Sequence, residues 1–275
     1  MIFTLRGLRS DTLTGFKRKV VFFTEKISCS LANKVIVISP SLMEHAINLG
    51  ILKRDKGIVL GKGSSNGVDV KRFSNTPENI LKGKNIRDHY GIHEKDIVIG
   101  HVGRITKDKG IEELYLAFKD CETSNDNIKL FLTGPIEDDD PIGSELMANI
   151  KGNKNVFLLG NQSDVPGIYA AYDILVLYSY REGFGNVAIE ASSMAKPVIV
   201  SDIPGARDTT DHMRSGIRVK PKDISELSKA LQYYLDNPAK RIEHGLYGEK
   251  RAREFFSSEV IWNGQLDLYK NLTRE

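Results

Sequence analysis

One segment of the chain joins an apolar run to a helix-like stretch through a glycine-punctuated turn. The apolar run is Ile174–Tyr178, and the helix-like stretch begins at Asn186. A strand that enters a helix in this way is typical of parallel α/β sheets. The first amides of such a helix have no partner within it, so an anion binds well there. Glu182 lies before the turn and Glu190 lies inside the helix, where both carboxylates can accept hydrogen bonds from hydroxyl groups. This combination suits a sugar joined to a phosphate.

Strand-like and helix-like patterns alternate from Asp96 onward. The strand-like runs are short and almost wholly apolar, as buried parallel strands are: Ile97–Val102, Ile128–Leu132, Val156–Leu159, Ile174–Tyr178, Pro197–Val200 and Gly216–Val219. The helix-like segments between them are Ile111–Phe118, Ser144–Ile150, Val165–Ala171, Val187–Met194 and Ile224–Leu235. The alternation predicts an α/β fold with a complete, Rossmann-like, doubly wound parallel sheet, in which ligands bind beyond the carboxyl ends of the strands.

The part of the chain before Asp96 has fewer such patterns. Its strand-like runs are Val35–Ile38 and Ile58–Leu60, and its helix-like segments are Gly15–Ala32 and Ser41–Leu49. So few strands bury too little apolar surface to offset the chain entropy, which predicts a partial α/β domain. We therefore divide the chain into a partial N-terminal domain over 1–75, the complete domain over 76–255, and a C-terminal helix over 256–275 that packs back across both.

Composition excludes several classes of protein. No apolar run reaches the roughly 18 residues of a membrane span, and the N-terminus lacks the layout of a signal peptide. Two cysteines, Cys29 and Cys121, give neither a disulfide framework nor the spacing of a metal site. The formal net charge of +3 is too small to indicate a nucleic-acid partner. These features predict a cytoplasmic protein without a bound metal.

The segment Phe16–Phe23 is both amphipathic and basic, since it contains Lys17, Arg18 and Lys19. Such a helix can rest on an anionic membrane surface. The alternative is a domain helix that buries its apolar side. The sequence leaves both open.

A second cluster of polar residues lies at the end of the first strand of the predicted complete domain. Gly103 and Arg104 end that strand, and Lys109 with Gly110 opens the next helix. Arginine can donate two hydrogen bonds to phosphate oxygens, and lysine supplies a point charge. The two cations at the carboxyl edge of a sheet can therefore neutralise a diphosphate.

These motifs together resemble a known family. Gly103-Arg104, Lys109-Gly110, Glu182-Gly183-Phe184-Gly185 with Glu190-Ala191, and the run from Pro197 to Gly205 are similar to the donor half of the family-4 retaining glycosyltransferases. That family has the GT-B architecture, in which two Rossmann-like domains face each other. A close subgroup builds bacterial surface polysaccharides. The resemblance covers nearly the whole chain, and family members usually begin with a longer N-terminal stretch.

The resemblance implies a role for each motif. Arg104 and Lys109 hold the diphosphate of the donor, Glu182 contacts the sugar hydroxyls, and Glu190 contacts the ribose. Arg104, Lys109 and Glu182 form the implied catalytic set. The remaining implied donor-binding residues are Gly103, Gly183, Phe184, Gly185, Asn186 and Val187.

The resemblance also implies an activity. The expected reaction moves a sugar, with retention, from a nucleotide-sugar donor, most often a UDP-sugar, to a glycan or polyprenyl-linked acceptor. It needs no cofactor and no metal, because Arg104, Lys109 and the helix amides would stabilise the charge of the leaving diphosphate. It also needs no dedicated base, because the leaving phosphate can take the acceptor's proton. The expected location is the cytoplasm, with possible peripheral contact at the inner face of the membrane.

Two other functions stay open. A truncated, non-catalytic protein that binds nucleotide-sugar without turning it over would keep the same donor motif. A sugar-nucleotide epimerase with a similar two-domain build would take its catalytic acids from the N-terminal half. Arg6 stands where many relatives of the resembled family carry a histidine near the reacting sugar. It either holds an anionic group or is an ordinary surface arginine.

Overall fold

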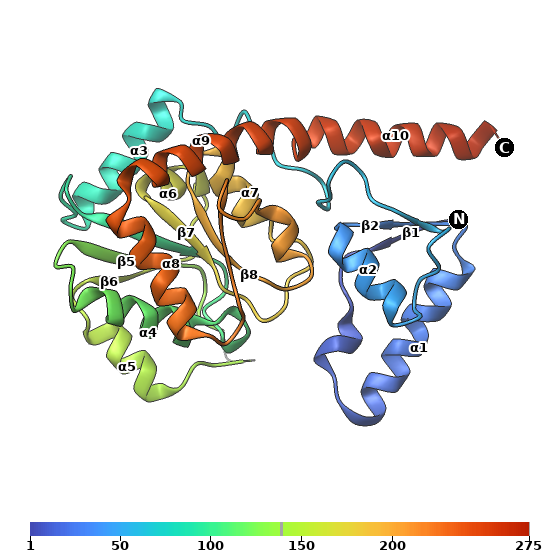
Figure 1. Cartoon of the computed structure of the whole chain (residues 1–275), viewed down its shortest axis with the longest axis horizontal. Helices are drawn as coiled ribbons and strands as arrows, with labels where there is room; N and C mark the ends of the chain where they lie inside the picture. Colours follow the sequence, from blue (N-terminus) through green and yellow to red (C-terminus); the bar gives the residue numbers. More distant parts are fainter. Residues whose placement is uncertain (138–139, 275) are drawn as a thin grey trace.

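Two parallel sheets organise the chain (Figure 1). The computed structural model describes residues 1–137 and 140–274. A three-stranded sheet has the order β1-β2-β3 and a six-stranded sheet has the order β6-β5-β4-β7-β8-β9. The strands are β1 Ile2–Leu5, β2 Lys34–Val37, β3 Gly57–Ile58, β4 Ile97–Val102, β5 Ile128–Thr133, β6 Val156–Gly160, β7 Ile174–Leu177, β8 Val198–Ser201 and β9 Gly216–Val219.

Helices connect the strands and cover the sheets. They are α1 Gly15–Leu31, α2 Pro40–Asn48, α3 Pro77–His89, α4 Ile111–Glu122, α5 Ser144–Gly152, α6 Val165–Ala171, α7 Asn186–Ser193, α8 Ile224–Asp236, α9 Pro238–Phe255 and α10 Ser258–Arg274. Short 3₁₀ helices are η1 Arg9–Thr12, η2 Lys107–Lys109 and η3 Ala206–Thr209. None of the helices in the described ranges is long and apolar enough to cross a bilayer.

The larger sheet is doubly wound, as predicted. On one side of β4 lie β5 and then β6, and on the other side lie β7, β8 and β9 in that order. The order reverses between β4 and β7, which pair in parallel. Every residue of β7 and β8 is buried, which explains why these strands consist almost wholly of apolar residues. In such sheets, ligands bind where the strand order reverses, beyond the carboxyl ends of the strands.

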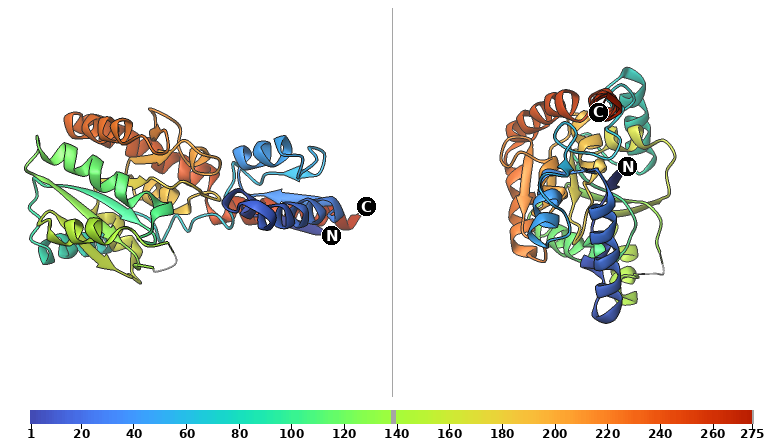
Figure 2. Two further views of the ribbon diagram at one scale, coloured as in Figure 1. Left: turned by 90° about the horizontal axis from the view of Figure 1, so that it is seen from below. Right: turned by 90° about the vertical axis from the view of Figure 1, so that its right-hand side faces the viewer.

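The smaller sheet is covered on both faces. Val35 and Val37 of β2 pack into the core that contains Cys29 of α1 and Leu42 of α2. Ile36 points to the other face, where it packs with Ile261 of α10. Because successive side chains of a strand point to opposite faces, α1 and α2 cover one face of this sheet and α10 covers the other. Figure 2 shows two further views of this arrangement.

Two sets of hydrogen bonds join the halves of the chain. The Val68 N–H donates to the carbonyl oxygen of Phe256 at 2.8 Å, and the Ser258 N–H donates to the carbonyl oxygen of Val68 at 3.0 Å. At the start of α2, the N–H and hydroxyl of Ser41 both donate to Asp208 Oδ2, at 2.9 and 2.6 Å. The connecting segment and the start of α2 are therefore tied to the larger half. The division of the chain at residues 75 and 255 remains a prediction.

The sequence did not predict α3. Its start has clear signals, because the Thr76 hydroxyl accepts from the Asn79 N–H and Pro77 is the first helical residue. However, the helix lacks a regular apolar stripe: Ile80 and Leu81 are exposed. Its packing face includes Gly83, where a side chain would collide with Ala170 of α6.

Candidate active site

A cleft of 780 Å³ lies between the carboxyl edges of the two sheets. One wall comes from the loop after β1 and from α2, and the other from the turns after β4, β7 and β8. The residues that line it are Arg6, Gly7, Leu8, Arg9, Asp11, Thr12, Leu13, Leu42, His45, Lys109, Tyr180, Arg181, Glu182, Gly183, Ile203 and Pro204. The position agrees with the expectation that ligands bind where the strand order reverses. Of the predicted site residues, Lys109, Glu182 and Gly183 line the cleft.

Lys109 and Glu182 form an ion pair in this cleft. Lys109 Nζ donates to Glu182 Oε2 at 2.9 Å, and the two side chains are 15% and 20% exposed. The pair joins the turn after β4 to the turn after β7, although 73 residues separate the partners. A lysine and a carboxylate that both remain accessible can bind phosphate oxygens and sugar hydroxyls, respectively.

Arg104 lies at the same edge of the sheet but has other partners. Its guanidinium donates to Glu137 Oε2 at 3.0 Å and to Asp108 Oδ2 at 3.4 Å. Among the described residues, Arg104 and Lys109 therefore share no partner, and Arg104 is not one of the residues that line the cleft. Both cations lie beyond the carboxyl end of β4, but they pair with different acids. Two further acids of the loop after β5, Asp138 and Asp139, lie outside the described residues.

The glycine-punctuated turn has the predicted shape. The helix α7 begins at Asn186, as expected, and Gly185 before it has a φ of 88°, which favours glycine. At Gly183 a side chain would overlap the carbonyl oxygen of Arg6, so the two walls of the cleft approach each other here through backbone. At Gly183 the turn therefore presents backbone, without a side chain, to the N-terminal wall.

The other residues of the turn hold it in place. Phe184 is buried, and its ring lies 5.5 Å from that of Phe256. Asn186 Oδ1 accepts a hydrogen bond from the hydroxyl of Ser64 at 3.0 Å. Val187 packs partly buried against the same core. In the predicted donor-binding set, the side chains of Phe184 and Val187 therefore contact protein.

Glu190 lies apart from Glu182 and has a different partner. The Tyr169 hydroxyl donates to Glu190 Oε2 at 2.8 Å, from the neighbouring helix α6. Burial raises the pKa of Glu190, and the hydrogen bond from Tyr169 and the charge of Arg72 partly oppose this shift. Within residues 1–137 and 140–274, the two glutamates of the motif have no common partner.

The N-terminal wall contains Arg6, a candidate already from the sequence, and also His45 and Asp11, which sequence patterns did not single out. His45 Nε2 and Asp11 Oδ2 lie 2.8 Å apart in the cleft. Arg6 is exposed and lines the cleft opposite Glu182, without an ion pair in the described part of the chain. No local sequence motif indicates His45 or Asp11, because the loop after β1 and the helix α2 meet only in the folded chain.

His101 near the end of β4 is fully buried. Burial and the positive charge of Lys109 lower the pKa of its imidazole to about 4. This histidine is therefore neutral at neutral pH, and it lies beneath the turn that carries Gly103.

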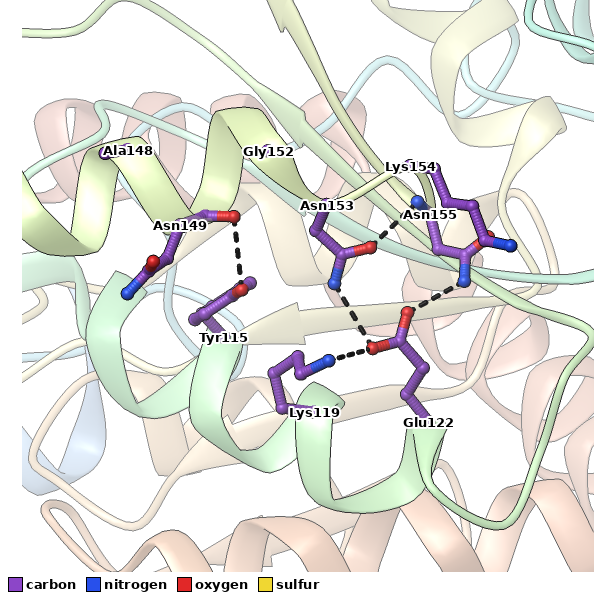
Figure 3. A pocket seen from close by; sticks show the side chains of 9 residues that line it. All are labelled: Tyr115, Lys119, Glu122, Ala148, Asn149, Gly152, Asn153, Lys154 and Asn155. Atoms are coloured by element: carbon purple, nitrogen blue, oxygen red, sulfur yellow. Dashed lines mark hydrogen bonds and ion pairs between the residues drawn. The ribbon is translucent and has the colours of Figure 1, made fainter.

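A second groove, of 580 Å³, lies at the opposite, amino-terminal edge of the larger sheet (Figure 3). Glu122 accepts hydrogen bonds there from Lys119, Asn153 and Asn155, at 2.6, 3.2 and 2.8 Å. Burial alone would raise the pKa of Glu122, but these hydrogen bonds outweigh it and the pKa is lowered. The network joins α4 to the loop before β6. None of the predicted site residues lines this groove.

Comparison with known proteins gives consistent results. A family model described as glycosyl transferases group 1 matches residues 83–251. The capsular polysaccharide biosynthesis glycosyltransferase CapM of Staphylococcus aureus is 35% identical over 274 residues, which is 100% of this chain and 71% of CapM. The N,N'-diacetylbacillosaminyl-diphospho-undecaprenol alpha-1,3-N-acetylgalactosaminyltransferase of Campylobacter jejuni is 27% identical, over 94% of this chain and 67% of its own length.

Solved structures show the same fold. The crystal structure of HepE of Anabaena in complex with UDP superposes with a TM-score of 0.81 at 21% identity, over 100% of this chain and 72% of HepE. The fold is therefore of the GT-B type, as predicted. Because the family model matches more than half of this chain, and the alignment with CapM covers all of this chain and 71% of CapM, the chain belongs to the group 1 glycosyltransferases.

Proposed function

We propose that this chain transfers a sugar from a UDP-sugar to a glycan or polyprenyl-linked acceptor, with retention, in the synthesis of a bacterial surface polysaccharide. The observation that best supports this function is the Lys109–Glu182 ion pair in a cleft between two parallel sheets. The names of CapM and of the Campylobacter jejuni relative support the acceptor class, and the UDP complex of HepE supports the donor.

In the proposed reaction, negative charge grows on the diphosphate as it leaves, and positive charge grows on the sugar. Lys109, Arg104 and the first amides of α7 would stabilise the negative charge. Glu182 would orient the sugar through its hydroxyls. The acceptor oxygen would form its bond to the anomeric carbon as the bond from that carbon to the diphosphate breaks, and the departing phosphate would accept the proton of the acceptor hydroxyl. No dedicated base is then needed, and neither glutamate acts as a nucleophile. The two cations would do this without a metal.

The location follows from the proposed acceptor. A polyprenyl chain is apolar and stays in a membrane, while the UDP-sugar is dissolved in the cytoplasm. We therefore infer that the protein acts in the cytoplasm, at the inner face of the membrane.

The donor site is tested by calorimetric titration with UDP. We expect Arg104→Ala and Glu190→Ala each to weaken UDP binding at least about tenfold, because each removes a charged hydrogen-bonding group. Arg214→Ala and Glu249→Ala are matched controls, since both residues form ion pairs outside the cleft. Unchanged UDP affinity in both site variants would refute the assignment. Release of UDP from a UDP-sugar by the wild type separates a transferase from a protein that only binds.

The pH dependence of UDP binding tests Glu190 further. The proposed contact with the ribose needs the ionised carboxylate, so affinity should fall as pH drops through the raised pKa of Glu190. Tyr169→Phe removes a hydrogen bond that lowers this pKa. We therefore expect the loss of affinity to begin at a higher pH in this variant, measured by titrations from about pH 5 to 8.

Tyr172→Phe is the control for this prediction, because the Tyr172 hydroxyl bonds to Thr133 and not to Glu190. The same pH profile in Tyr169→Phe and wild type would contradict the role of Glu190.

The raised pKa of Glu190 also has a consequence for folding. The folded state binds more protons than the unfolded state above the ordinary value of 4.5, so this group lowers stability as pH rises from there toward its folded pKa.

A further inference from the structure

The helix α1 carries a continuous apolar stripe on its exposed side. Phe16, Phe23 and Leu31 are 80%, 62% and 70% exposed, and Val20 and Ile27 between them are 46% and 42% exposed. At about 100° per residue, these five side chains fall within an arc of about 80°. Isolated exposed apolar residues are ordinary, but an uninterrupted stripe along a helix marks an interaction surface.

The stripe lies opposite the side of α1 that packs on the protein. Cys29 is buried and Phe22 is partly buried in the core, and Glu25 accepts hydrogen bonds from the N–H of Arg9 and the hydroxyl of Ser10. These residues lie on the far side of the helix from the stripe. A neighbouring helix in the same layer would contact the flanks of α1. The stripe instead points away from the sheet, where a flat external surface can meet it.

Positive charges border the stripe on both sides. Lys17 lies on one side, and Lys19 and Lys26 lie on the other, each about 80–100° from its centre on the helix. All three are exposed, and none forms an ion pair within the residues that the structure describes. Lysines beside an apolar face can extend their ammonium groups toward lipid phosphates while the apolar side chains enter the interface.

We infer that α1 docks on an anionic lipid bilayer through the stripe of Phe16, Val20, Phe23, Ile27 and Leu31. The inference identifies the surface that contacts the membrane of the acceptor, and in this respect it rests on the proposed function. The loop from Arg6 to Leu13, which lines the cleft, leads directly into α1. Docking through α1 therefore holds the N-terminal wall of the cleft beside the membrane that carries the acceptor.

Vesicle flotation tests the inference, with phosphatidylglycerol-rich and pure phosphatidylcholine vesicles and no sugar ligand. The wild type should float with the anionic vesicles and much less with the neutral ones. Phe16→Ser/Phe23→Ser/Ile27→Ser should lower the partition coefficient at least about 30-fold. Lys17→Glu/Lys19→Glu/Lys26→Glu should lower it at least about 100-fold, since each lysine near an anionic surface contributes about a factor of five.

Two control variants match these changes. Lys84→Glu/Lys151→Glu/Lys229→Glu reverses three exposed lysines of the larger half and should bind lipid within about threefold of the wild type. Trp262→Ser/Leu266→Ser removes exposed apolar residues of α10, on the other face of the small sheet, and should also bind normally. All variants should keep the UDP affinity of the wild type, because none of the altered residues lines the cleft.

Several outcomes would overturn the inference. The inference is wrong if the wild type fails to float with anionic vesicles. It is also wrong if the α10 variant loses lipid binding while the α1 variants keep it. Equal binding to neutral vesicles would show that the lysines do not select the lipid. Sedimentation that shows a dimer in wild type and a monomer in the stripe variant would assign the stripe to a second copy of the chain. Because UDP titration is run without lipid, failure here is distinguishable from failure of the proposed donor site.

Discussion

Glu182→Gln is expected to lower the rate of UDP release from a UDP-sugar at least about 100-fold, with UDP affinity within about threefold of wild type. The substitution keeps the size of the side chain but removes the charge that faces Lys109 Nζ at 2.9 Å. In the proposed reaction, Glu182 holds the sugar, whereas Arg104 and Lys109 hold the diphosphate. The effect should therefore appear in kcat, because the groups that bind UDP remain.

The contrasting variant is Lys109→Ala, which should weaken UDP binding as well as turnover. Glu249→Gln is the matched control, because Glu249 also forms an ion pair, with Arg253 at 2.9 Å, but lies on α9 outside the cleft. Steady-state kinetics with the UDP-sugar that most raises the melting temperature, together with calorimetry, separates the two effects. A kcat for Glu182→Gln within a factor of about three of wild type would remove Glu182 from the mechanism.

The larger sheet could be predicted from the sequence because its strands are buried on both faces. Such strands consist of nearly unbroken apolar runs, so β4 and β7 were predicted to within one residue of their observed ends. The start of α7 at Asn186 followed from the glycines before it. In contrast, α3 was missed because most of its surface is polar or exposed and its packing depends on Gly83.

The predicted site residues are brought to one edge of one sheet, but their partners could not be predicted. Glu137 lies 33 residues from Arg104, and Tyr169 lies 21 residues before Glu190. Periodicity reports which face of an element is buried, and it does not report which side chains meet across two elements. The N-terminal wall shows the same limit, because His45 and Asp11 meet only through the packing of α2 beside the loop after β1.

The ring of Phe256 connects the stability of the fold to the shape of the site. Phe256 is fully buried, its ring packs on that of Phe184, and the Arg251 guanidinium lies 4.7 Å above it. Its carbonyl oxygen also accepts the N–H of Val68 in the segment that joins the two halves. Phe184 lies within the turn between Gly183 and Gly185. We therefore expect the position of this turn to depend on packing at Phe256.

Phe256→Ala should lower the free energy of unfolding by about 3–5 kcal/mol, as expected when a buried aromatic ring is replaced by a methyl group and leaves a cavity. Thermal and denaturant unfolding measure this loss. Phe118→Ala is the matched control, because Phe118 is equally buried but belongs to the other core of the larger half. Both variants should lose similar stability. Only Phe256→Ala should also weaken UDP binding, by at least about fivefold at a temperature where both are folded, because only it frees Phe184 and the turn before α7. If the two variants bind UDP equally well, the turn is held independently of Phe256.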